Sequence, residues 1–324
     1  MPNPVLVEVT RGPLVESVHR GSVAIADASG TLRFQIGDVV TPVYTRSSLK
    51  PIQALPLVES GAAEAFGVSD EEVALACASH SGEAMHTIRV AAWLSRIGCT
   101  PDDLLCGPQA VRHEPTLEMM LTTQEKPSRL HNNCSGKHAG FLTVAKHLGA
   151  STADYVNIQH PVQQAILESM IRLSDYRDSA WGIDGCAAPN FALPLTAFAT
   201  ALARIAAHQT PGAARIVKAM TTYPELVGGT GRHCTLLMQA AGGKAAVKVG
   251  AEGVYAAMLP ELGLGVALKI DDGAVRGGET AIAAILEALK LIDPAAGLST
   301  TTILNTRGTE VGVTRPAAGL KAIA

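Results

Sequence analysis

The chain has 324 residues, of which 47% are hydrophobic and 4% aromatic, so it can bury a large core built from Ala, Val, Leu and Ile. Its formal net charge of −3 and the lack of a Lys/Arg stripe argue against a nucleic-acid partner. No cationic leader and no apolar run of membrane-spanning length occur, so we expect a cytoplasmic protein with no membrane segment.

The predicted elements begin with strands. Residues 17–36 alternate apolar and polar positions around the turn-forming tetrad at 27–30, which predicts a hairpin. Strand-like runs return near the C-terminus, at 245–251 and 264–270, and a helix at about 278–291 and an extended stretch at 305–313 follow them. Between the two strand regions, helical patterns occur at 50–66, 70–78, 86–97, 115–122, 137–148, 161–173, 194–208 and 211–222.

This order of elements predicts an α/β fold in which a mostly antiparallel sheet is layered with helices and carries an inserted helical lobe. We expect a single domain over residues 1–324. Its α/β layer should come from about 1–60 and 243–324, and its helical lobe from about 61–242.

Ser47 and Lys50 stand three residues apart at the expected start of an apolar helix, so their hydroxyl and amine can lie on one face. A serine hydroxyl becomes a good nucleophile when a neighbour accepts its proton. Lysine can accept it when burial and a helix N-terminus lower its pKa, and the nearly uncharged run 51–58 provides an apolar setting. The alternative is an N-cap serine beside a solvated lysine, but the flanking sequence favours catalysis.

A second candidate is the run of small polar residues at 77–83, which contains Ser79 and His80 and interrupts a helical pattern. Such a break can present side chains to a pocket. The simpler interpretation is a loop at a helix C-terminus.

A third candidate is the segment 132–138, in which Gly136-Lys137 superficially resembles a phosphate loop. His131 stands where such a loop needs glycine, so we reject nucleotide binding. What remains is a helix N-terminus crowded with Cys134, Lys137 and His138, a setting that stabilises a thiolate.

A glycine-rich turn at 182–189 carries Asp184 and Cys186. Six cysteines in a chain of this size fit reduced thiols better than a disulfide framework. Three alternatives stay open for Cys134 and Cys186: a shared metal, a disulfide or neither. Their spacing is not that of a zinc finger. The other four are interpreted as core thiols: Cys77, Cys99, Cys106 and Cys234.

Lys248 and Gly250 lie on the predicted strand at 245–251. Penicillin-recognising serine hydrolases carry Lys-Thr-Gly on such a strand, where glycine lets a substrate lie against the backbone. Lys-x-Gly alone is a weak signal, but it gains weight when it follows Ser-x-x-Lys in the same chain.

Taken in order, these motifs resemble those of the rhizobial-type, or class 3, L-asparaginases, and the similarity spans nearly the whole chain. The motifs are Arg46-Ser47-x-x-Lys50-Pro51, Ala78-Ser79-His80-Ser81, Asn133-Cys134-Ser135-Gly136-Lys137-His138, Asp184-Gly185-Cys186 and Lys248-x-Gly250-Ala251. The resemblance implies a fold similar to that of serine β-lactamases and serine glutaminases, and a homodimer.

The resemblance also implies the site residues and the reaction. Two Ser–Lys tandems, Ser47 with Lys50 and Ser79 with Lys248, would hydrolyse the side-chain amide of L-asparagine to L-aspartate and ammonia through an acyl-enzyme. Ser47 is favoured over Ser79 as the primary nucleophile. The substrate-binding residues would be Arg46 for the α-carboxylate, His80, and Asp184 for the α-ammonium or the metal shell. A zinc ion, which the chemistry would not strictly require, would be held by Cys134, Lys137 and Cys186.

Three alternatives remain. A serine-type glutaminase is the nearest one, since a pocket discriminates one methylene by only about 1–3 kcal/mol. The second is a non-catalytic small-molecule sensor, and the third is a metal-stabilised structural protein. A β-lactamase role is disfavoured because Ser69-Asp70 and Ser174-Asp175 are not followed by the Asn of the Ser-Asp-Asn element.

Overall fold

The computed structural model describes residues 2–323. It divides into two compact units, each described here by itself. Unit 1 comprises residues 1–48, 192–207 and 236–324, and unit 2 comprises 49–191 and 208–235. Relative to the expected α/β layer and helical lobe, residues 49–60 belong to unit 2, and residues 192–207 and 236–242 belong to unit 1. Whether the chain forms a single domain stays a prediction.

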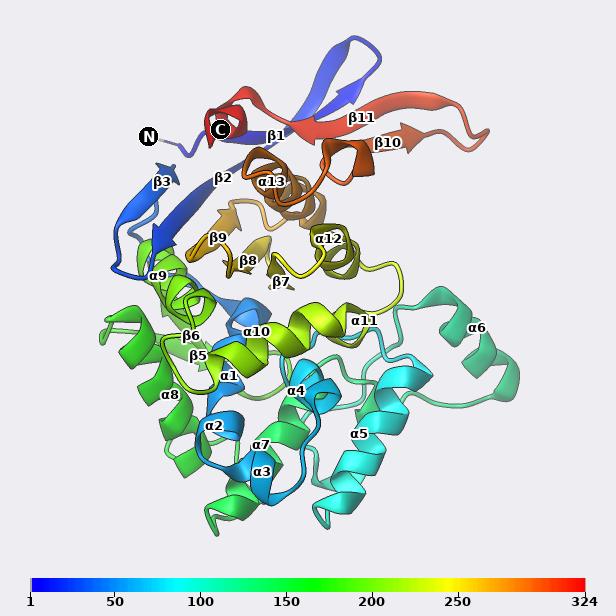
Figure 1. Cartoon of the computed structure of the whole chain (residues 1–324). Coiled ribbons are helices and arrows are strands. Elements are labelled where there is room, and N and C mark those ends of the chain that lie inside the picture. Colours follow the sequence, from blue (N-terminus) through cyan, green and yellow to red (C-terminus); the bar gives the residue numbers. More distant parts are fainter. Residues whose placement is uncertain (1, 324) are drawn as a thin grey trace. The chain divides into compact units, whose positions relative to one another are not determined.

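Unit 1 is built on an eight-stranded sheet whose paired strands are all antiparallel (Figure 1). The order across the sheet is β10 (Thr301–Leu304), β11 (Glu310–Pro316), β1 (Val5–Arg11), β2 (Leu14–Asp27), β9 (Leu264–Ile270), β8 (Val254–Leu259) and β7 (Ala246–Val249), with β3 (Leu32–Ile36) also paired to β2. The predicted hairpin at 17–36 is confirmed, and so is the mixed α/β class with a mostly antiparallel sheet.

Two helices cover opposite faces of this sheet: α9 (Leu195–Ala206) and α13 (Val275–Ala288). Gly265 of β9 faces α9, where a Cβ would lie 2.1 Å from the carbonyl oxygen of Ala199. Ile270 of the same strand contacts Gly277 of α13. Residues five apart on a strand point to opposite faces, so the sheet lies between the two helices. Glycine at 265 allows the close approach of α9.

Unit 2 is mostly helical. Its helices are α1 (Lys50–Gln53), α2 (Leu55–Glu59), α3 (Ala62–Ala65), α4 (Asp70–Ala76), α5 (Ala84–Arg96), α6 (Glu114–Thr123), α7 (Ser135–His147), α8 (Pro161–Ser174), α10 (Ala213–Thr222) and α11 (Pro224–Val227). The short strand β5 (Trp181–Ile183) pairs with the start of β6 (Pro189–Leu193). Unit 1 contains β4 (Val43–Tyr44), which pairs with the end of β6. The helix α12 (His233–Ala241) runs from unit 2 into unit 1.

The expected helix at 50–66 is instead three short helices, α1 to α3. Pro56 has no N–H to donate to the preceding turn, which favours a break before it. Gly61 has a φ of 83° and so takes the left-handed conformation between α2 and α3. Strands β1 and β8 and helix α12 were not predicted at all.

Helix α7 is the centre of unit 2, and every residue from Ser135 to Ala145 is buried. Its N-terminus touches α4 so closely that a Cβ on Gly136 would lie 2.4 Å from the carbonyl oxygen of Leu75. The buried polar residues of α7 are concentrated in this first turn. That position is where the sequence analysis expected functional residues.

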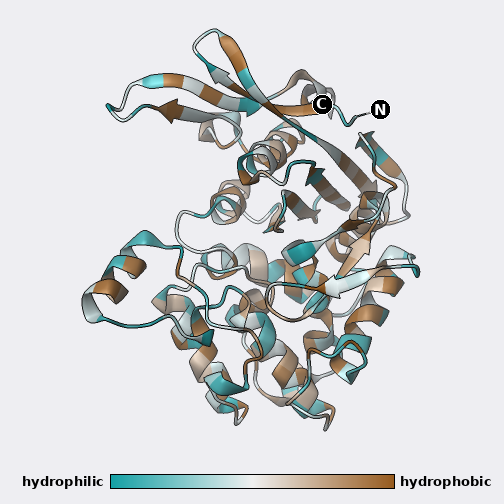
Figure 2. Ribbon diagram, turned by 180° about the vertical axis from the view of Figure 1, so that it is seen from behind, coloured by the Kyte–Doolittle hydropathy of each residue, from teal (hydrophilic) through white to brown (hydrophobic). Residues whose placement is uncertain are grey.

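Helix α6 differs from the other helices of unit 2, because it exposes Leu117, Met119 and Leu121 and buries only Met120. Figure 2 shows the hydrophobic segments of this helix in brown. In the described part of the chain, every helix is too short or too polar to span a membrane.

Candidate active site

Lys50 and Ser79 meet inside unit 2. Lys50 begins α1, and Ser79 lies in the loop between α4 and α5. The Nζ atom of Lys50 is 3.0 Å from the hydroxyl oxygen of Ser79 and 3.5 Å from the carbonyl oxygen of Asn133, and it also donates to the carbonyl of Ala78. Only 1% of Lys50 is exposed. This arrangement allows a proton to pass between the lysine and the serine hydroxyl.

Backbone hydrogen bonds from distant segments fix the loop that carries Ser79. The N–H of Ser79 donates to the carbonyl of Val227 at 2.9 Å, and the N–H of His80 donates to the carbonyl of Asn133 at 3.3 Å. The loop is therefore held between α11 on one side and the residues before α7 on the other. Such support holds the Ser79 hydroxyl in one geometry.

The ring of His80 is buried and uses both nitrogens inside the protein. Its Nδ1 accepts the N–H of Gly82 at 3.1 Å, so its Nε2 carries the proton and donates to the Ser135 hydroxyl at 2.9 Å. The ring also stacks on that of His86, with centroids 4.7 Å apart. His80 thus ties the Ser79 loop to the start of α7, and the substrate contact expected of it stays a prediction.

The start of α7 and the turn before β6 bring Cys134, Lys137 and Cys186 together. All three side chains are buried. The Nζ atom of Lys137 donates to the sulfur of Cys186 at 3.1 Å and lies 5.3 Å from the centroid of the Phe141 ring. The two thiols also share a hydrogen bond. The three residues assigned to zinc from the sequence therefore form one cluster.

Charges in this cluster compensate one another. The hydrogen bond between the thiols lowers the pKa of Cys186 and raises that of Cys134. Burial lowers the pKa of Lys137, but the sulfurs of Cys186 and Cys134 outweigh it, and the pKa is raised above its ordinary value. Cys186 is therefore the more acidic thiol of the pair and lies beside the amine of Lys137, and none of the six cysteines forms a disulfide.

The donor set of this cluster fits zinc, which prefers thiolate and nitrogen ligands. Among residues 2–323, no group of three or more His, Cys, Asp or Glu side chains is arranged to hold a metal, so the third protein ligand of a zinc ion here would be Lys137. A lysine binds a metal only as the neutral amine. Zinc binding would therefore displace the proton of Lys137, which would make the affinity dependent on pH.

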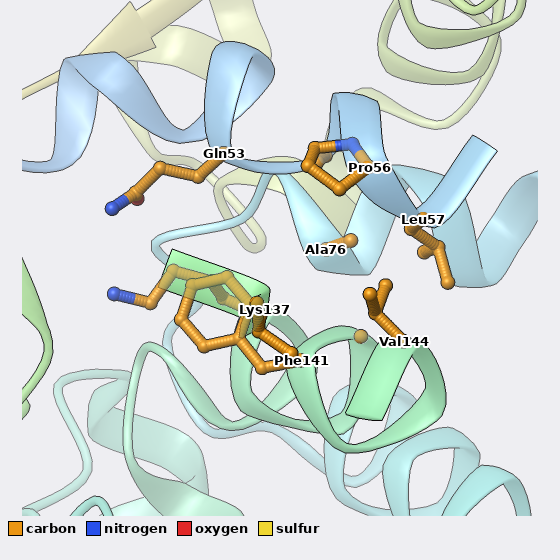
Figure 3. A pocket seen from close by; sticks show the side chains of 10 residues that line it. Gln53, Pro56, Leu57, Ala76, Lys137, Phe141 and Val144 are labelled. Carbon is orange, nitrogen blue, oxygen red and sulfur yellow. The ribbon is translucent and has the colours of Figure 1, made fainter. Parts of the chain in front are cut away.

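A small pocket beside Lys137 lies between helices α1 and α2 on one side and α7 on the other (Figure 3). Figure 3 shows the amide of Gln53 and the amine of Lys137 pointing to one side, with Leu57 and Val144 at the other end. The Gln53 amide nitrogen donates to the carbonyl of Pro189 at 3.4 Å. The interior measures about 10 Å³, close to the space that one water molecule needs. This pocket packs the stem of Lys137 and is too small for an amino acid.

Unit 1 brings together the strand of Lys248 and the segment that precedes Ser47. Lys248 lies on β7 with 1% exposure, and its Nζ donates to the carbonyl of Val249 at 2.8 Å. A Cβ at Gly250 would lie 3.0 Å from the carbonyl oxygen of Thr45 and 3.4 Å from the Cβ of Arg46. Glycine at 250 is what allows these two segments to lie against each other.

Ser47 itself belongs to the 3₁₀ helix η1 (Arg46–Leu49), directly before α1, and it is half-buried. Arg46 precedes it with a φ of 52°, a left-handed conformation that a long side chain adopts at a cost. The guanidinium of Arg46 lies 3.9 Å from the carboxylate of Glu252.

Asp184 is half-buried and opens the turn that presents Cys186. Its N–H donates to the carbonyl of Ala188 at 2.9 Å, and its carboxylate accepts the N–H of Gly185 at 2.8 Å. Ala187 completes this turn with a φ of 69°. Asp184 also raises the pKa of Lys137, after the larger effects of burial and the two sulfurs.

The four predicted catalytic residues are divided between the units. Ser47 and Lys248 belong to unit 1, and Lys50 and Ser79 belong to unit 2. Each predicted tandem has one member in each unit, so both pairings stay predictions. The pair that lies within one unit, Lys50 with Ser79, was not predicted from the sequence.

A family model described as L-asparaginase II matches residues 7–316. The chain belongs to the L-asparaginase II family. The match covers nearly the whole chain and confirms the resemblance that the motifs indicated. Membership makes the protein an amidohydrolase of the L-asparaginase type. No curated protein sequence matches the chain significantly.

Solved structures similar to this L-asparaginase II chain are distant ones. The crystal structure of Mglu is 17% identical, with a TM-score of 0.44, and the match covers 90% of this chain and 72% of that one. Mglu in its glutamate form is 18% identical, with a TM-score of 0.43 and coverage of 84% and 61%. A putative beta-lactamase from Bacteroides dorei DSM 17855 is 12% identical, with a TM-score of 0.44 and coverage of 78% and 87%.

One network near Ser79 in this L-asparaginase II chain was missed from the sequence. The buried carboxylate of Glu83 accepts the N–H of Thr230 at 2.9 Å and its hydroxyl at 2.6 Å. A Cβ on Gly229 would lie 2.2 Å from the hydroxyl oxygen of Ser81. The loop at 228–231 is thus packed against residues 81–83. Its three glycines around Thr230 are the signal that indicates this close approach.

Proposed function

We propose that this protein hydrolyses the side-chain amide of L-asparagine to L-aspartate and ammonia through an acyl-enzyme built with two Ser–Lys tandems. The observation that carries the proposal is the buried Lys50 amine, 3.0 Å from the Ser79 hydroxyl, in a chain of the L-asparaginase II family. A buried amine that contacts a serine hydroxyl is suited to proton transfer during acyl transfer.

In the first half-reaction, Ser47 attacks the side-chain carbonyl carbon of the substrate and gives its proton to the neutral amine of Lys50. The C–N bond then breaks and ammonia leaves, with Ser79 passing the proton from Lys50 to the departing nitrogen. Lys248 supports Ser79 in this relay. In the second half-reaction, water attacks the acyl-enzyme ester, L-aspartate is released and Ser47 recovers its proton.

The substrate is held by its charged groups. Arg46 binds the α-carboxylate, since a guanidinium matches a carboxylate with two parallel hydrogen bonds. His80 and Asp184 support binding, with Asp184 facing the α-ammonium or the metal shell. Amides that are longer than asparagine, or that lack its charged groups, would make weaker contacts with these residues, and this difference sets the preference for asparagine.

Cys134, Lys137 and Cys186 would hold a zinc ion. When bound, the ion supplies a fixed positive charge that orients the substrate, since the serine already provides the nucleophile. The thiolate of Cys186 and the amine of Lys137 must both be free of protons for this role. We further propose a homodimer and a cytoplasmic location.

The test is ammonia release from L-asparagine and L-glutamine by the wild type, Ser47→Ala and Ser79→Ala. We expect turnover of asparagine by the wild type and loss of turnover in both variants, because members of a catalytic set fail together. Mass spectrometry of protein quenched during turnover should detect the aspartyl ester in the wild type and not in Ser47→Ala.

Other outcomes would redirect the proposal. A preference for glutamine would make the protein a serine-type glutaminase. No ammonia from either substrate, with or without added zinc, would reject the enzyme and favour the small-molecule sensor. An ester that persists in Ser47→Ala would assign the nucleophile to Ser79.

A further inference from the structure

Glu252 takes a left-handed backbone conformation away from any helix end. Among the described residues, seven non-glycine positions have positive φ angles. Four of them follow the C-terminus of a helix, where the left-handed conformation is common: Gln124, Asp175, His208 and Lys290. The other three are Arg46, Ala187 and Glu252, and the first two adjoin Ser47 and Cys186. Strained residues of this kind concentrate at functional sites.

Glu252 and Gly253 form the tight turn between β7 and β8. Their φ angles are 57° and 67°, and the N–H of Val254 donates to the carbonyl of Ala251 at 3.4 Å. Two successive positive φ angles define a type I′ hairpin turn, and Asn or Asp is strongly preferred at the position that Glu252 occupies. Glutamate is less favourable there, but its side chain is longer than that of Asp and carries the carboxylate farther from the backbone.

The backbone of this turn is held firmly, although the carboxylate is exposed. Lys269 donates its amine to the carbonyl of Glu252 at 2.8 Å, and the N–H of Ile270 donates to the carbonyl of Gly253 at 3.0 Å. The side chain of Glu252 is nevertheless 69% exposed. The turn therefore keeps its backbone in place while the carboxylate of Glu252 stays accessible to solvent.

Arg46 faces this carboxylate across the close approach of Gly250. The guanidinium nitrogen and the carboxylate oxygen are 3.9 Å apart, longer than the 2.7–2.9 Å or so of a charge-assisted hydrogen bond. The side chain of Arg46 is 25% exposed and that of Glu252 is mostly in solvent, so an ion pair at that distance adds little to stability. The turn explains the φ angle of Glu252, but neither the turn nor the stability of this pair requires opposite charges to face each other beside Ser47.

We propose that Glu252 is a specificity-determining residue that binds the α-ammonium of the substrate while Arg46 binds its α-carboxylate. Together the two side chains form a receptor for the charged head group of an α-amino acid, next to the serine that attacks its side chain. The choice of ligand rests on the proposed asparaginase activity. Asp184 is then left to the metal shell.

The test compares ligands that differ only in the α-ammonium group. Calorimetry measures the binding of L-aspartate and succinate to the wild type, Glu252→Gln and Glu252→Asn. The matched control is Glu261→Gln, at an exposed glutamate in the turn between β8 and β9. The second variant, Glu252→Asn, suits the turn, so a folding defect in the first does not decide the result.

We expect both Glu252 variants to bind L-aspartate at least about tenfold more weakly, the loss typical of one charge-assisted hydrogen bond. Succinate binding should change by less than about twofold, and Glu261→Gln should match the wild type. The kcat/KM for L-asparagine should fall through KM, while that for succinamate, which lacks the ammonium, should stay constant.

Equal losses for L-aspartate and succinate, or no loss for either, would overturn the assignment of Glu252. So would a wild type that binds neither ligand. A wild type that releases no ammonia from L-asparagine but still discriminates L-aspartate from succinate through Glu252 would reject the proposed reaction and keep the amino-acid receptor.

Discussion

The two units handle their charged candidate residues in opposite ways. In unit 2, Lys50, Lys137 and Cys186 are buried, and each side chain has a partner within hydrogen-bond distance. In unit 1, Arg46 is partly buried and Glu252 is exposed, and their opposite charges lie 3.9 Å apart on left-handed backbone. Buried polar groups cost free energy unless they have partners, so the first set is fixed by the fold. The exposed carboxylate of Glu252 adds little to the fold, and we propose that it binds a ligand.

Replacing Lys50 should have the largest effect. We expect Lys50→Met to lower kcat by about 10³-fold or more, since the amine is both the proposed base and the neighbour of Ser79. Its stability should fall by only about 1–3 kcal/mol, the cost of carbonyls left without a donor. Steady-state kinetics and urea unfolding measure the two effects, with the exposed Lys244→Met as control. A folded variant that keeps a tenth of the activity would contradict the base role.

Removing and restoring zinc should have the next largest effect. Zinc added to chelator-treated protein should stabilise it by about 2.7 kcal/mol at a hundredfold excess over Kd. Cys186→Ser and Lys137→Met should lose this gain, whereas Cys99→Ser, at a buried thiol elsewhere in unit 2, should keep it. Thermal unfolding followed with and without zinc measures the gain. Equal stabilisation of Lys137→Met would exclude the lysine as a ligand.

Acid should weaken unit 2 through its buried histidines. Burial lowers the pKa of His86, whose Nδ1 accepts the N–H of Glu83, so the folded state holds it neutral. Its contribution to stability is present above the unfolded pKa of about 6.5 and is lost as the pH falls towards the lower, folded value.

The corresponding slope is about 1.4 kcal/mol per pH unit for one histidine. Denaturant unfolding between pH 7.5 and pH 5 should show a smaller loss for His86→Asn than for the wild type. The exposed His208→Asn should keep the wild-type slope. An unchanged slope in His86→Asn would mean that this ring does not govern the acid response.

Glu252→Asn should have the smallest effect on stability. Because Asn suits the turn and the carboxylate of Glu252 is exposed and 3.9 Å from Arg46, we expect the free energy of unfolding to stay within about 1 kcal/mol of the wild type or to rise. Urea unfolding is the measurement. A fall of more than about 2 kcal/mol in the free energy of unfolding would mean that the Glu252 carboxylate stabilises the fold. The charged residues of unit 1 would then be as structural as those of unit 2.

The sequence predicts local features of this fold well. The turn tetrad at 27–30 and the alternation around it predict the hairpin, and the polar cluster at 132–138 predicts the start of α7. Strand β8 escaped prediction because all six of its residues are buried, and a short apolar run has no period that separates strand from helix.

The candidate site was predictable in its residue types and less so in its pairings. A separation of three residues predicts that Ser47 and Lys50 lie on one helix face. No sequence pattern predicts the contact between Lys50 and Ser79, which are 29 residues apart in the chain. That pair exists because the backbone of Val227 and Asn133 holds the loop. Glu252 looks like any surface charge in the sequence, and only its φ angle distinguishes it.

The division of the chain into units has a consequence for biosynthesis. The chain passes from one unit to the other at residues 48/49, 191/192, 207/208 and 235/236, so neither unit is a continuous segment. In unit 1, β1 pairs with β11, where Val7 lies opposite Pro316. This pairing closes a loop of nearly the whole chain, and long-range pairings of that kind form slowly. During synthesis, β1 leaves the ribosome long before β11, its partner in the sheet. Until β11 is made, the edge of β1 that pairs with it is exposed and can promote aggregation.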